Sequence, residues 1–369
     1  MKKILMIGPF PGVIHGQSIA NQNLYKGFEE RYLVSKINTT KDEILENKAE
    51  QGKFILNKFS KILKELFIEI KQILTNEYDV IYMTSGQSFL GFMRFFPYML
   101  ICIIKSTPYY NHIHGGSFRK MYNSQSRFKQ KLLEFFIKKS AGMIVLGESL
   151  KSMFEGIIEE NKIYVCENGV HDDIVATEDE IKEKIERYKK DTKKRVLYLS
   201  NLMEEKGILD LLKASEKFNG DEIEFNLAGA IEPSIKDQVE DYLKKYPKKI
   251  KYHGIVRGKQ KKKLLLENYI FILPTYYSNE GQPISILEAY ATGYAVITDE
   301  SVGGIRDIFR NGVNGLSIKN RYVEDICNAI RDISEERYFK ENYKKVLKKY
   351  TKKNFVKNIE KIILQEVKL

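Results

Sequence analysis

Short apolar runs alternate with longer amphipathic stretches along most of the chain. The runs of the first half lie at 3–8, 80–85, 109–114, 142–147 and 162–170. The alternation restarts later, with runs at 195–200, 223–229, 250–256, 269–275 and 295–298. Strands that alternate with helices of ten or more residues are typical of βαβ units and a parallel sheet. The pattern therefore predicts an α/β protein with two parallel-sheet domains.

The alternation fails at 171–194, where the sequence is polar and dense in charge. We expect a linker with one exposed helix there, between an N-terminal domain at 1–170 and a C-terminal domain at 195–350. A lysine-rich helical tail follows at 351–369. Ligands of open parallel sheets bind beyond the C-terminal ends of the strands. The loops that follow strands are therefore where we expect the chemistry.

Length and composition agree with two domains in a reducing compartment. The 369 residues are 43% hydrophobic and 30% charged, which suffices for two cores. The three cysteines lie far apart without ligand-like spacing, which favours buried thiols over a disulfide or a metal site. The longest apolar stretch, 95–104, is about half as long as a membrane span, and the first run is too short for a signal peptide. We expect a cytoplasmic protein that does not cross the membrane.

The net charge of +12 adds a question about partners. The first half carries the larger share of this excess, which suggests attraction to lipid headgroups, phosphates or nucleic acid, or else a basic surface without a partner. The stretches 57–74 and 127–139 combine lysines with aromatic and aliphatic residues. They suit helices that lie on the inner face of an anionic membrane, although core-facing stripes with solvated lysines would look the same. No RNP-like or helix-turn-helix pattern supports nucleic acid.

Candidate chemistry in the second half begins with Lys206 and Gly207, which follow the run at 195–200 at a helix start. A helix N-terminus with a lysine beside it forms an anion site, although a solvated lysine fits the same pattern. The stretch 276–298 then places Glu280 on a loop and Glu288 in the first turns of a helix. A carboxylate accepts two hydroxyl hydrogen bonds at once, which suits the vicinal diol of a ribose or sugar ring.

The loop between Glu280 and that helix contains residues that indicate a ligand contact and a helix start. Gly281 permits close approach of the backbone to a ligand, and Pro283 suits the first turn of a helix. The predicted helix covers 284–292, and Gly293 would end it.

The first half offers weaker candidates. Its first loop is rich in glycine without matching G-x-G-x-x-G, yet a phosphate could rest near Gly16 on the following helix. We expect His112 and His114 to point to opposite faces of a strand, so that they cannot share a metal. His114, beside two glycines, is then a candidate hydrogen-bonding residue at a cleft, or a structural one.

Together these residues resemble the retaining glycosyltransferases of family 4, which have the GT-B fold. The resemblance rests on Lys206-Gly207, on the E-x7-E element from Glu280 to Glu288, and on the His114 motif "HGG". It extends to the Gly16 loop, "ENGV" at 167–170 and the stretch 303–318, and so covers nearly the whole chain. It implies two Rossmann-like domains facing each other across a cleft, with the C-terminal helix packing back on the N-terminal domain.

The resemblance also implies roles. Lys206 would bind the donor diphosphate, Glu288 the ribose hydroxyls and Gly16 a phosphate, while His114 would reach the sugar from the first domain. Glu280 would hold the transferred sugar together with amides of the Gly281–Ile284 loop, whose donor-binding residues would be Gly281, Gln282, Pro283 and Ile284.

Two positions depart from the family pattern. Asn201 stands where the family usually has arginine, so the donor site loses a cation and a bidentate fork. Glu167 replaces the usual proline before "NGV". No Asp-x-Asp element stands out at a strand end, so we expect no required metal and no cofactor, with the nucleotide sugar as a substrate.

The implied function is transfer of a hexose or N-acetylhexosamine, with retention, from a nucleotide sugar to a saccharide acceptor. UDP is the default nucleotide by family frequency. If the basic helices meet a membrane, the acceptor is lipid-linked and the setting is bacterial surface polysaccharide assembly, such as O-antigen or capsule. The alternatives are an enzyme like the UDP-N-acetylglucosamine 2-epimerases, a nucleotide-sugar-binding module without catalysis, and a nucleic-acid-binding protein.

Overall fold

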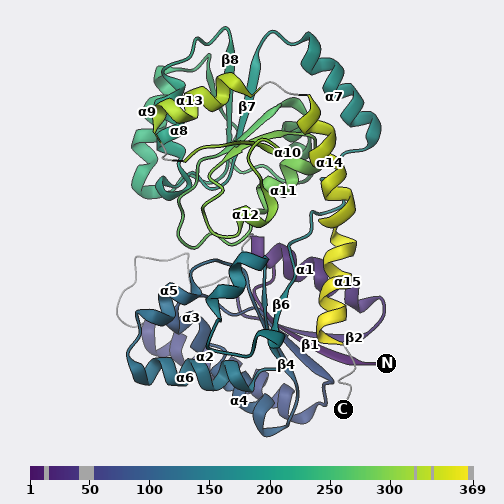
Figure 1. The fold of residues 1–369 in the computed structure, drawn as a ribbon. Helices are drawn as coiled ribbons and strands as arrows, with labels where there is room; N and C mark the ends of the chain where they lie inside the picture. Colours follow the sequence, from purple (N-terminus) through teal and green to yellow (C-terminus); the bar gives the residue numbers. More distant parts are fainter. Residues whose placement is uncertain (12–15, 41–53, 320–321, 334–335, 365–369) are drawn as a thin grey trace. The chain divides into compact units, whose positions relative to one another are not determined.

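The computed structural model describes residues 1–11, 16–40, 54–319, 322–333 and 336–364, which form two compact units. Unit 1 comprises Met1–Glu167 and Phe355–Leu369, and unit 2 comprises Asn168–Asn354. Each unit contains one six-stranded parallel sheet (Figure 1). The predicted architecture of two parallel α/β domains is confirmed.

The sheet of unit 1 has the strand order β2-β1-β3-β4-β5-β6. Its strands are β1 (Lys3–Gly8), β2 (Leu33–Asn38), β3 (Val80–Met83), β4 (Tyr109–Ile113), β5 (Gly142–Val145) and β6 (Ile163–Val165). Its helices are α1 (Gly16–Glu29), α2 (Phe54–Thr75), α3 (Phe89–Met93), α4 (Phe96–Ile104), α5 (Phe118–Asn123), α6 (Arg127–Lys139) and most of α15 (Lys352–Ile363). In register, Ile4 of β1 lies opposite Val34 and Val80.

Alternate residues of the central strands build a separate core on each face of this sheet. Leu5 and Ile7 of β1 pack in the core beneath α4 and α6, whereas Ile4 and Met6 pack in the core beneath α1 and α15. Both faces are covered, which is why these strands read as continuous apolar runs. No helix among the residues described is long and apolar enough to span a membrane.

The expected packing of the C-terminal helix on the N-terminal domain is confirmed. Figure 1 shows α15 beside α1, where a Cβ at Gly27 would touch the Val356 side chain. Arg31 donates to Glu360 at 2.7 Å, and the Tyr32 hydroxyl donates to the same carboxylate.

The sheet of unit 2 has the order β12-β11-β10-β7-β8-β9. Its strands are β7 (Lys194–Leu199), β8 (Ile223–Ala228), β9 (Ile250–Tyr252), β10 (Ile270–Leu273), β11 (Ala295–Thr298) and β12 (Gly315–Ser317). Its helices are α7 (Glu178–Lys190), α8 (Ile208–Ser215), α9 (Lys236–Lys245), α10 (Gly258–Glu267), α11 (Ile284–Ala291), α12 (Ile305–Ile308), α13 (Val323–Asp332) and α14 (Arg337–Lys349).

The segment expected to be a linker with an exposed helix is a packed part of unit 2. A capping box between Thr177 and Glu180 starts α7. Ile181 and Ile185 are buried in the core of unit 2, and Lys184 is buried between them. The expectation of an exposed helix was wrong because this short apolar stripe is diluted by charged residues on the other sides of α7.

Candidate functional site

The carboxyl edge of the unit 2 sheet gathers the two candidate glutamates with two lysines. Glu280, on the loop after β10, forms an ion pair with Lys206, on the loop after β7. Glu288, within α11, forms an ion pair with Lys261 of α10, with 2.6 Å between the ammonium and carboxylate groups. We call them the 206–280 pair and the 261–288 pair. All four side chains are at most 20% exposed.

Local backbone geometry brings Lys206 to Glu280. Because β7 and β10 are neighbours in the sheet, the loops that follow them meet. Gly207 adopts a φ of +75°, and a Cβ there would collide with the Pro274 carbonyl oxygen. The backbone NH of Tyr276 donates to Glu205 O at 2.9 Å, which joins the two loops. The Lys206 ammonium also lies 4.9 Å from the centroid of the Tyr277 ring.

The loop from Glu280 to Pro283 is buried and held from two sides. Gly304 N donates to Gly281 O at 2.8 Å, and a Cβ at Gly303 would collide with the Glu280 carbonyl oxygen. The Gln282 carboxamide oxygen accepts from Asn168 N at 2.7 Å, and the Asn168 side chain donates to Gln282 O at 3.2 Å. The Gln282 side chain is thus held by a hydrogen bond to the backbone of Asn168 in the same unit.

The start of α11 agrees with the sequence prediction. The helix begins at Ile284, directly after Pro283, and Gly293 with a φ of +69° lies just beyond its end. Thr292, at the C-terminal cap, donates its hydroxyl to Glu288 O at 2.8 Å. The position of the Glu288 backbone is therefore fixed by α11 and by the hydrogen bond from Thr292.

Asn201 lies close to the turn that carries Lys206. The Tyr198 hydroxyl lies 3.0 Å from Asn201 O and 3.4 Å from Lys206 O, which links the two backbone segments. Asn201 is exposed. It contributes no positive charge where the resemblance would place an arginine.

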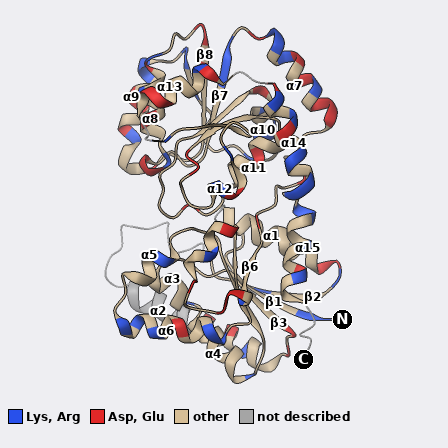
Figure 2. Cartoon of the chain, in the orientation of Figure 1, with Lys and Arg blue, Asp and Glu red and all other residues tan. Residues whose placement is uncertain are grey.

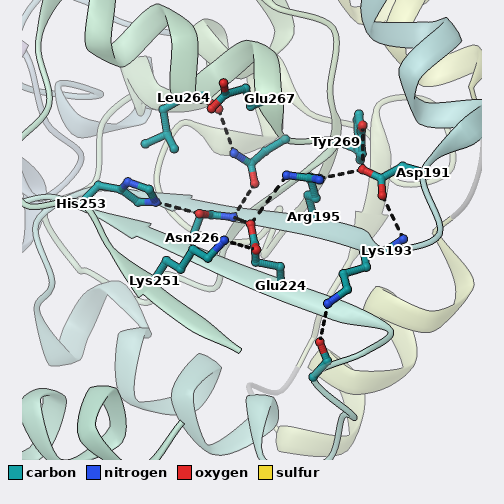
Figure 3. A network of polar contacts seen from close by, with 12 residues as sticks. Asp191, Lys193, Arg195, Glu224, Asn226, Lys251, His253, Leu264, Glu267 and Tyr269 are labelled. Atoms are coloured by element: carbon teal, nitrogen blue, oxygen red, sulfur yellow. Dashed lines mark hydrogen bonds and ion pairs between the residues drawn. The ribbon is translucent and has the colours of Figure 1, made fainter. Parts of the chain in front are cut away.

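A polar network crosses the sheet from the amino ends of β7, β8 and β10 to the loop after β9 (Figure 3). Asn226 of β8 donates to Glu224 at 3.0 Å and to Asn268 at 2.8 Å, so its oxygen accepts from His253 Nε2 at 2.7 Å. Burial, with the charge of Lys251 as a second cause, lowers the pKa of His253. A neutral imidazole therefore anchors the loop between β9 and α10.

The same network continues to the end of α7. Arg195 of β7 bonds Asp191 at 2.6 Å, and the Tyr269 hydroxyl donates to the same carboxylate at 3.1 Å. The charges of this network are compensated by one another inside unit 2. We therefore interpret the network as one that stabilises the sheet.

The candidates of unit 1 lie at the carboxyl edge of its own sheet. Gly16 is the first residue of α1, and its neighbour Gln17 donates to Thr84 O at 3.2 Å. His114 directly follows β4 and is half-buried. The candidate residues therefore fall into two groups, with Gly16 and His114 in unit 1 and the others in unit 2.

The expected orientation of the two histidines was wrong. The ring centroids of His112 and His114 lie 4.1 Å apart, because residues two positions apart on a strand share a face. His112 is fully buried, and its Nδ1 lies 2.7 Å from the Tyr82 hydroxyl. Burial lowers the pKa of His112, with His114 as a second cause. His112 is therefore an uncharged ring on which His114 rests.

Neutral polar side chains also lie at this end of the sheet, and the sequence interpretation missed them. The Asn21 amide donates to the Thr84 hydroxyl at 2.8 Å, and the Ser85 hydroxyl lies 3.3 Å from Asn111 Oδ1. All four residues are buried. The available signal was a polar residue at or directly after an apolar run, as at Thr84 and Ser85.

The described part of the chain contains no cluster of three or more His, Cys, Asp or Glu side chains arranged to hold a metal. Cys102, Cys166 and Cys327 are free and buried, which confirms the expectation for the thiols.

The family model of the glycosyl transferases group 1 matches residues 177–354. This part of the chain belongs to the glycosyl transferases group 1 family. The family and the enzyme class that the resemblance predicted are thereby confirmed. The match covers most of unit 2, including both Lys–Glu pairs. No curated protein matches the chain by sequence.

Solved structures similar to the chain share its fold at low identity. Anabaena HepE in complex with UDP and glucose has a TM-score of 0.72 at 14% identity, with 100% of both chains covered. Sucrose-phosphate synthase from Thermosynechococcus elongatus has a TM-score of 0.73 at 13% identity, with 99% of each chain covered. The apo lipopolysaccharide outer core galactosyltransferase WaaB has a TM-score of 0.67 at 14% identity, with 98% of this chain and 99% of that chain covered. The expected GT-B fold is confirmed.

Proposed function

We propose that this group 1 glycosyltransferase moves a hexose or N-acetylhexosamine from a UDP-sugar to a saccharide acceptor, with retention of configuration. The observation that carries the proposal is the pair of shielded Lys–Glu contacts at the carboxyl edge of unit 2. Ligands of parallel sheets bind at this edge. The UDP-bound state of similarly folded HepE supports the choice of nucleotide.

The two glutamates bracket the donor in this proposal. Glu288 accepts hydrogen bonds from the ribose diol, and Glu280 with the Gly281–Ile284 backbone holds the transferred sugar. Lys206 binds the diphosphate, which gains negative charge as the glycosidic bond breaks. A cation that is already positioned by Glu280 and Tyr277 stabilises that charge with little reorganisation.

Unit 1 supplies the acceptor side and further donor contacts. At its edge the half-buried imidazole of His114 suits a hydroxyl of a neutral saccharide, and the amides and hydroxyls beneath it are buried. His114 hydrogen-bonds the transferred sugar, and Gly16 provides a backbone contact to phosphate. We assign no metal to the reaction, because Lys206 can stabilise the charge of the leaving diphosphate.

A lipid-linked acceptor is favoured by the surface of α2, α4 and α6. These helices are neighbours, since the Tyr98 hydroxyl donates to Glu69 at 2.5 Å and the rings of Phe96 and Phe136 pack at 5.2 Å. Large apolar side chains are exposed on all three: Phe67, Ile68, Leu74, Leu100, Ile104, Phe128 and Phe135. Lysines and arginines accompany them along α6 (Figure 2). Apolar groups beside cations favour an anionic lipid surface.

Vesicle sedimentation tests this surface. Ile104→Ser with Phe128→Ser should release the protein from phosphatidylglycerol vesicles, while Val313→Ser, at an exposed apolar residue of unit 2, should not. Equal sedimentation of both variants would remove the support for a lipid-linked acceptor. In that case, surface polysaccharide assembly at the inner membrane face would lose its structural basis.

Donor binding is tested by calorimetry with UDP, UDP-glucose, UDP-galactose, UDP-N-acetylglucosamine and GDP-mannose. We expect one UDP-sugar to bind and be consumed when an acceptor is present. Glu288→Gln should weaken that binding by roughly tenfold or more, because it removes a charged acceptor from two hydroxyls. Glu267→Gln, which alters a more exposed glutamate of unit 2, is the matched control. Failure of every nucleotide to bind would refute the proposal.

One alternative function is a donor-binding module without transfer activity. It is suggested by Asn201, an exposed residue that leaves Lys206 without a second cation beside it. Binding without turnover on any acceptor would favour that alternative. Conversion of UDP-N-acetylglucosamine to an epimer without acceptor would instead favour the epimerase hypothesis.

A further inference from the structure

Three consecutive lysines on α10 pair with carboxylates from three different elements. Lys261 pairs with Glu288 of α11 at 2.6 Å, Lys262 with Glu180 of α7 at 2.9 Å, and Lys263 with Glu267 of α10 itself at 3.8 Å. Successive helical residues point in directions about 100° apart, so only one of the three can reach the candidate site. That residue is Lys261.

The degree of shielding separates these pairs. The side chains of Lys261 and Glu288 are 20% and 8% exposed, whereas those of Lys263 and Glu267 are 75% and 43% exposed. An exposed pair contributes little, because water and salt screen it. A shielded carboxylate needs a partner for its charge. Lys261 supplies that partner to Glu288.

A buried frame fixes the spacing of the two helices that carry this pair. The Lys184 ammonium donates to Leu265 O of α10 at 3.0 Å and to Thr292 O beyond α11 at 2.9 Å. Thr292 in turn donates its hydroxyl to Glu288 O. The contact between Lys261 and Glu288 therefore joins two helices that are held together independently of it.

We propose that Lys261 is a positioning residue for the nucleoside end of the donor. It holds the Glu288 carboxylate in one orientation and compensates its charge, so that both oxygens can accept the ribose hydroxyls in a site that also admits an anion. This inference rests on the proposed function, since it assigns the ribose to Glu288. Lys206, paired with Glu280, remains the cation for the diphosphate.

A double-mutant cycle with uridine and UDP as ligands tests the proposal. Lys261→Met should weaken binding of both ligands by on the order of tenfold, because it leaves a shielded carboxylate unpaired. Lys261→Arg should recover part of the loss. In a Glu288→Gln background, Lys261→Met should have little further effect, because the lysine acts through that carboxylate.

Two neighbouring variants control for effects of charge and folding. Lys263→Met removes an exposed charge from the same helix and should change affinity by less than about twofold. Lys262→Met removes another shielded pair, so it should lower thermal stability without a selective loss of uridine binding. A melting temperature measured for each variant separates loss of fold from loss of ligand contact.

Each outcome decides the proposal. If Lys261→Met binds uridine and UDP as the wild type does, Lys261 has no role at the donor and the inference fails alone. If the loss persists in the Glu288→Gln background and is larger for UDP than for uridine, Lys261 contacts phosphate directly and the positioning role is refuted. If the wild type binds neither ligand, the proposed function fails as well.

Discussion

The carboxyl edges of the two sheets differ in the kind of polar group that they present. In unit 2, four charged side chains form the two shielded Lys–Glu pairs. In unit 1, the corresponding edge holds amides, hydroxyls and two imidazoles in contact with each other. Both sheets are parallel and six-stranded, so architecture does not dictate this chemistry. The charged edge suits an anionic molecule, and the neutral edge suits hydroxyl groups.

The largest effect is expected at the charged edge. Lys206→Met should lower kcat/KM for the UDP-sugar by on the order of a hundredfold or more, because the leaving diphosphate loses its positioned cation. Steady-state kinetics would measure this loss. Lys213→Met, at an exposed lysine of α8, should leave kcat/KM unchanged. Near-normal activity of Lys206→Met would show that the anionic donor does not depend on this edge.

A smaller and different effect is expected at the neutral edge. His114→Ala should lower kcat by roughly tenfold, the value of one hydrogen bond to a sugar hydroxyl, while the affinity for UDP is retained. Calorimetry with UDP beside the kinetic assay separates the two quantities. His171→Ala, at a half-exposed histidine of unit 2, is the control. Loss of UDP affinity in His114→Ala would break the division between the edges.

The charge of unit 2 can also be increased. Asn201→Arg should raise UDP affinity by about threefold at low salt, because it adds an exposed cation near Lys206. The gain should shrink as ionic strength rises, since salt screens exposed charges. Asn201→Gln keeps the amide and should behave as the wild type. Titrations at two salt concentrations provide the measurement, and a gain that salt does not reduce would contradict an electrostatic cause.

The smallest effect concerns a lysine of unit 2 that lies outside the two pairs. Lys345 of α14 donates to Ile308 O at 2.5 Å and lies 3.2 Å from Asn314 Oδ1. Burial, with Lys349 as a second cause, lowers the pKa of Lys345 to about 8, below the usual value for lysine of about 10.4. Above pH 8 the unfolded chain therefore holds a proton that the folded chain has released.

Lys345 should therefore make the free energy of unfolding rise with pH between 8 and 10. Below pH 8 the lysine is protonated in both states, so it should make no contribution to the change with pH. Urea unfolding of the wild type and of Lys345→Met at pH 7, 8 and 9 would isolate it. A constant difference between the two proteins at all three values would refute the lowered pKa.

The sequence predicted most strands because strands buried on both faces form continuous apolar runs. It missed β2, half of whose residues are exposed at an edge of the sheet, and β12, whose three residues include one large apolar side chain. Neither provides an apolar run of useful length. The charged sequence of α7 concealed its buried side for a related reason, since two isoleucines among many charges give a weak pattern.

The candidate site was predictable only in part. Motif spacing located Lys206, Glu280 and Glu288, but no pattern distinguishes Lys261 from the two lysines that follow it. Which of them meets Glu288 depends on the rotation of α10 and on its spacing from α11, and both are set by tertiary contacts such as those of Lys184. The wrong prediction for the two histidines has a simpler origin. Residues two positions apart on a strand point to the same face, whereas His112 and His114 were expected to point to opposite faces.

The path of the chain has a consequence for protein synthesis. Unit 1 is interrupted by all of unit 2 and resumes in α15, whose Phe355, Val356 and Ile359 belong to a core of unit 1. The ring of Phe355 also lies 6.5 Å from that of His112. A ribosome therefore releases every strand of the first sheet, and α1, long before α15, which completes the cover on that face of the sheet. Until then part of this apolar face is uncovered, and we expect chaperones that bind apolar nascent chains to contact it during translation of the second sheet.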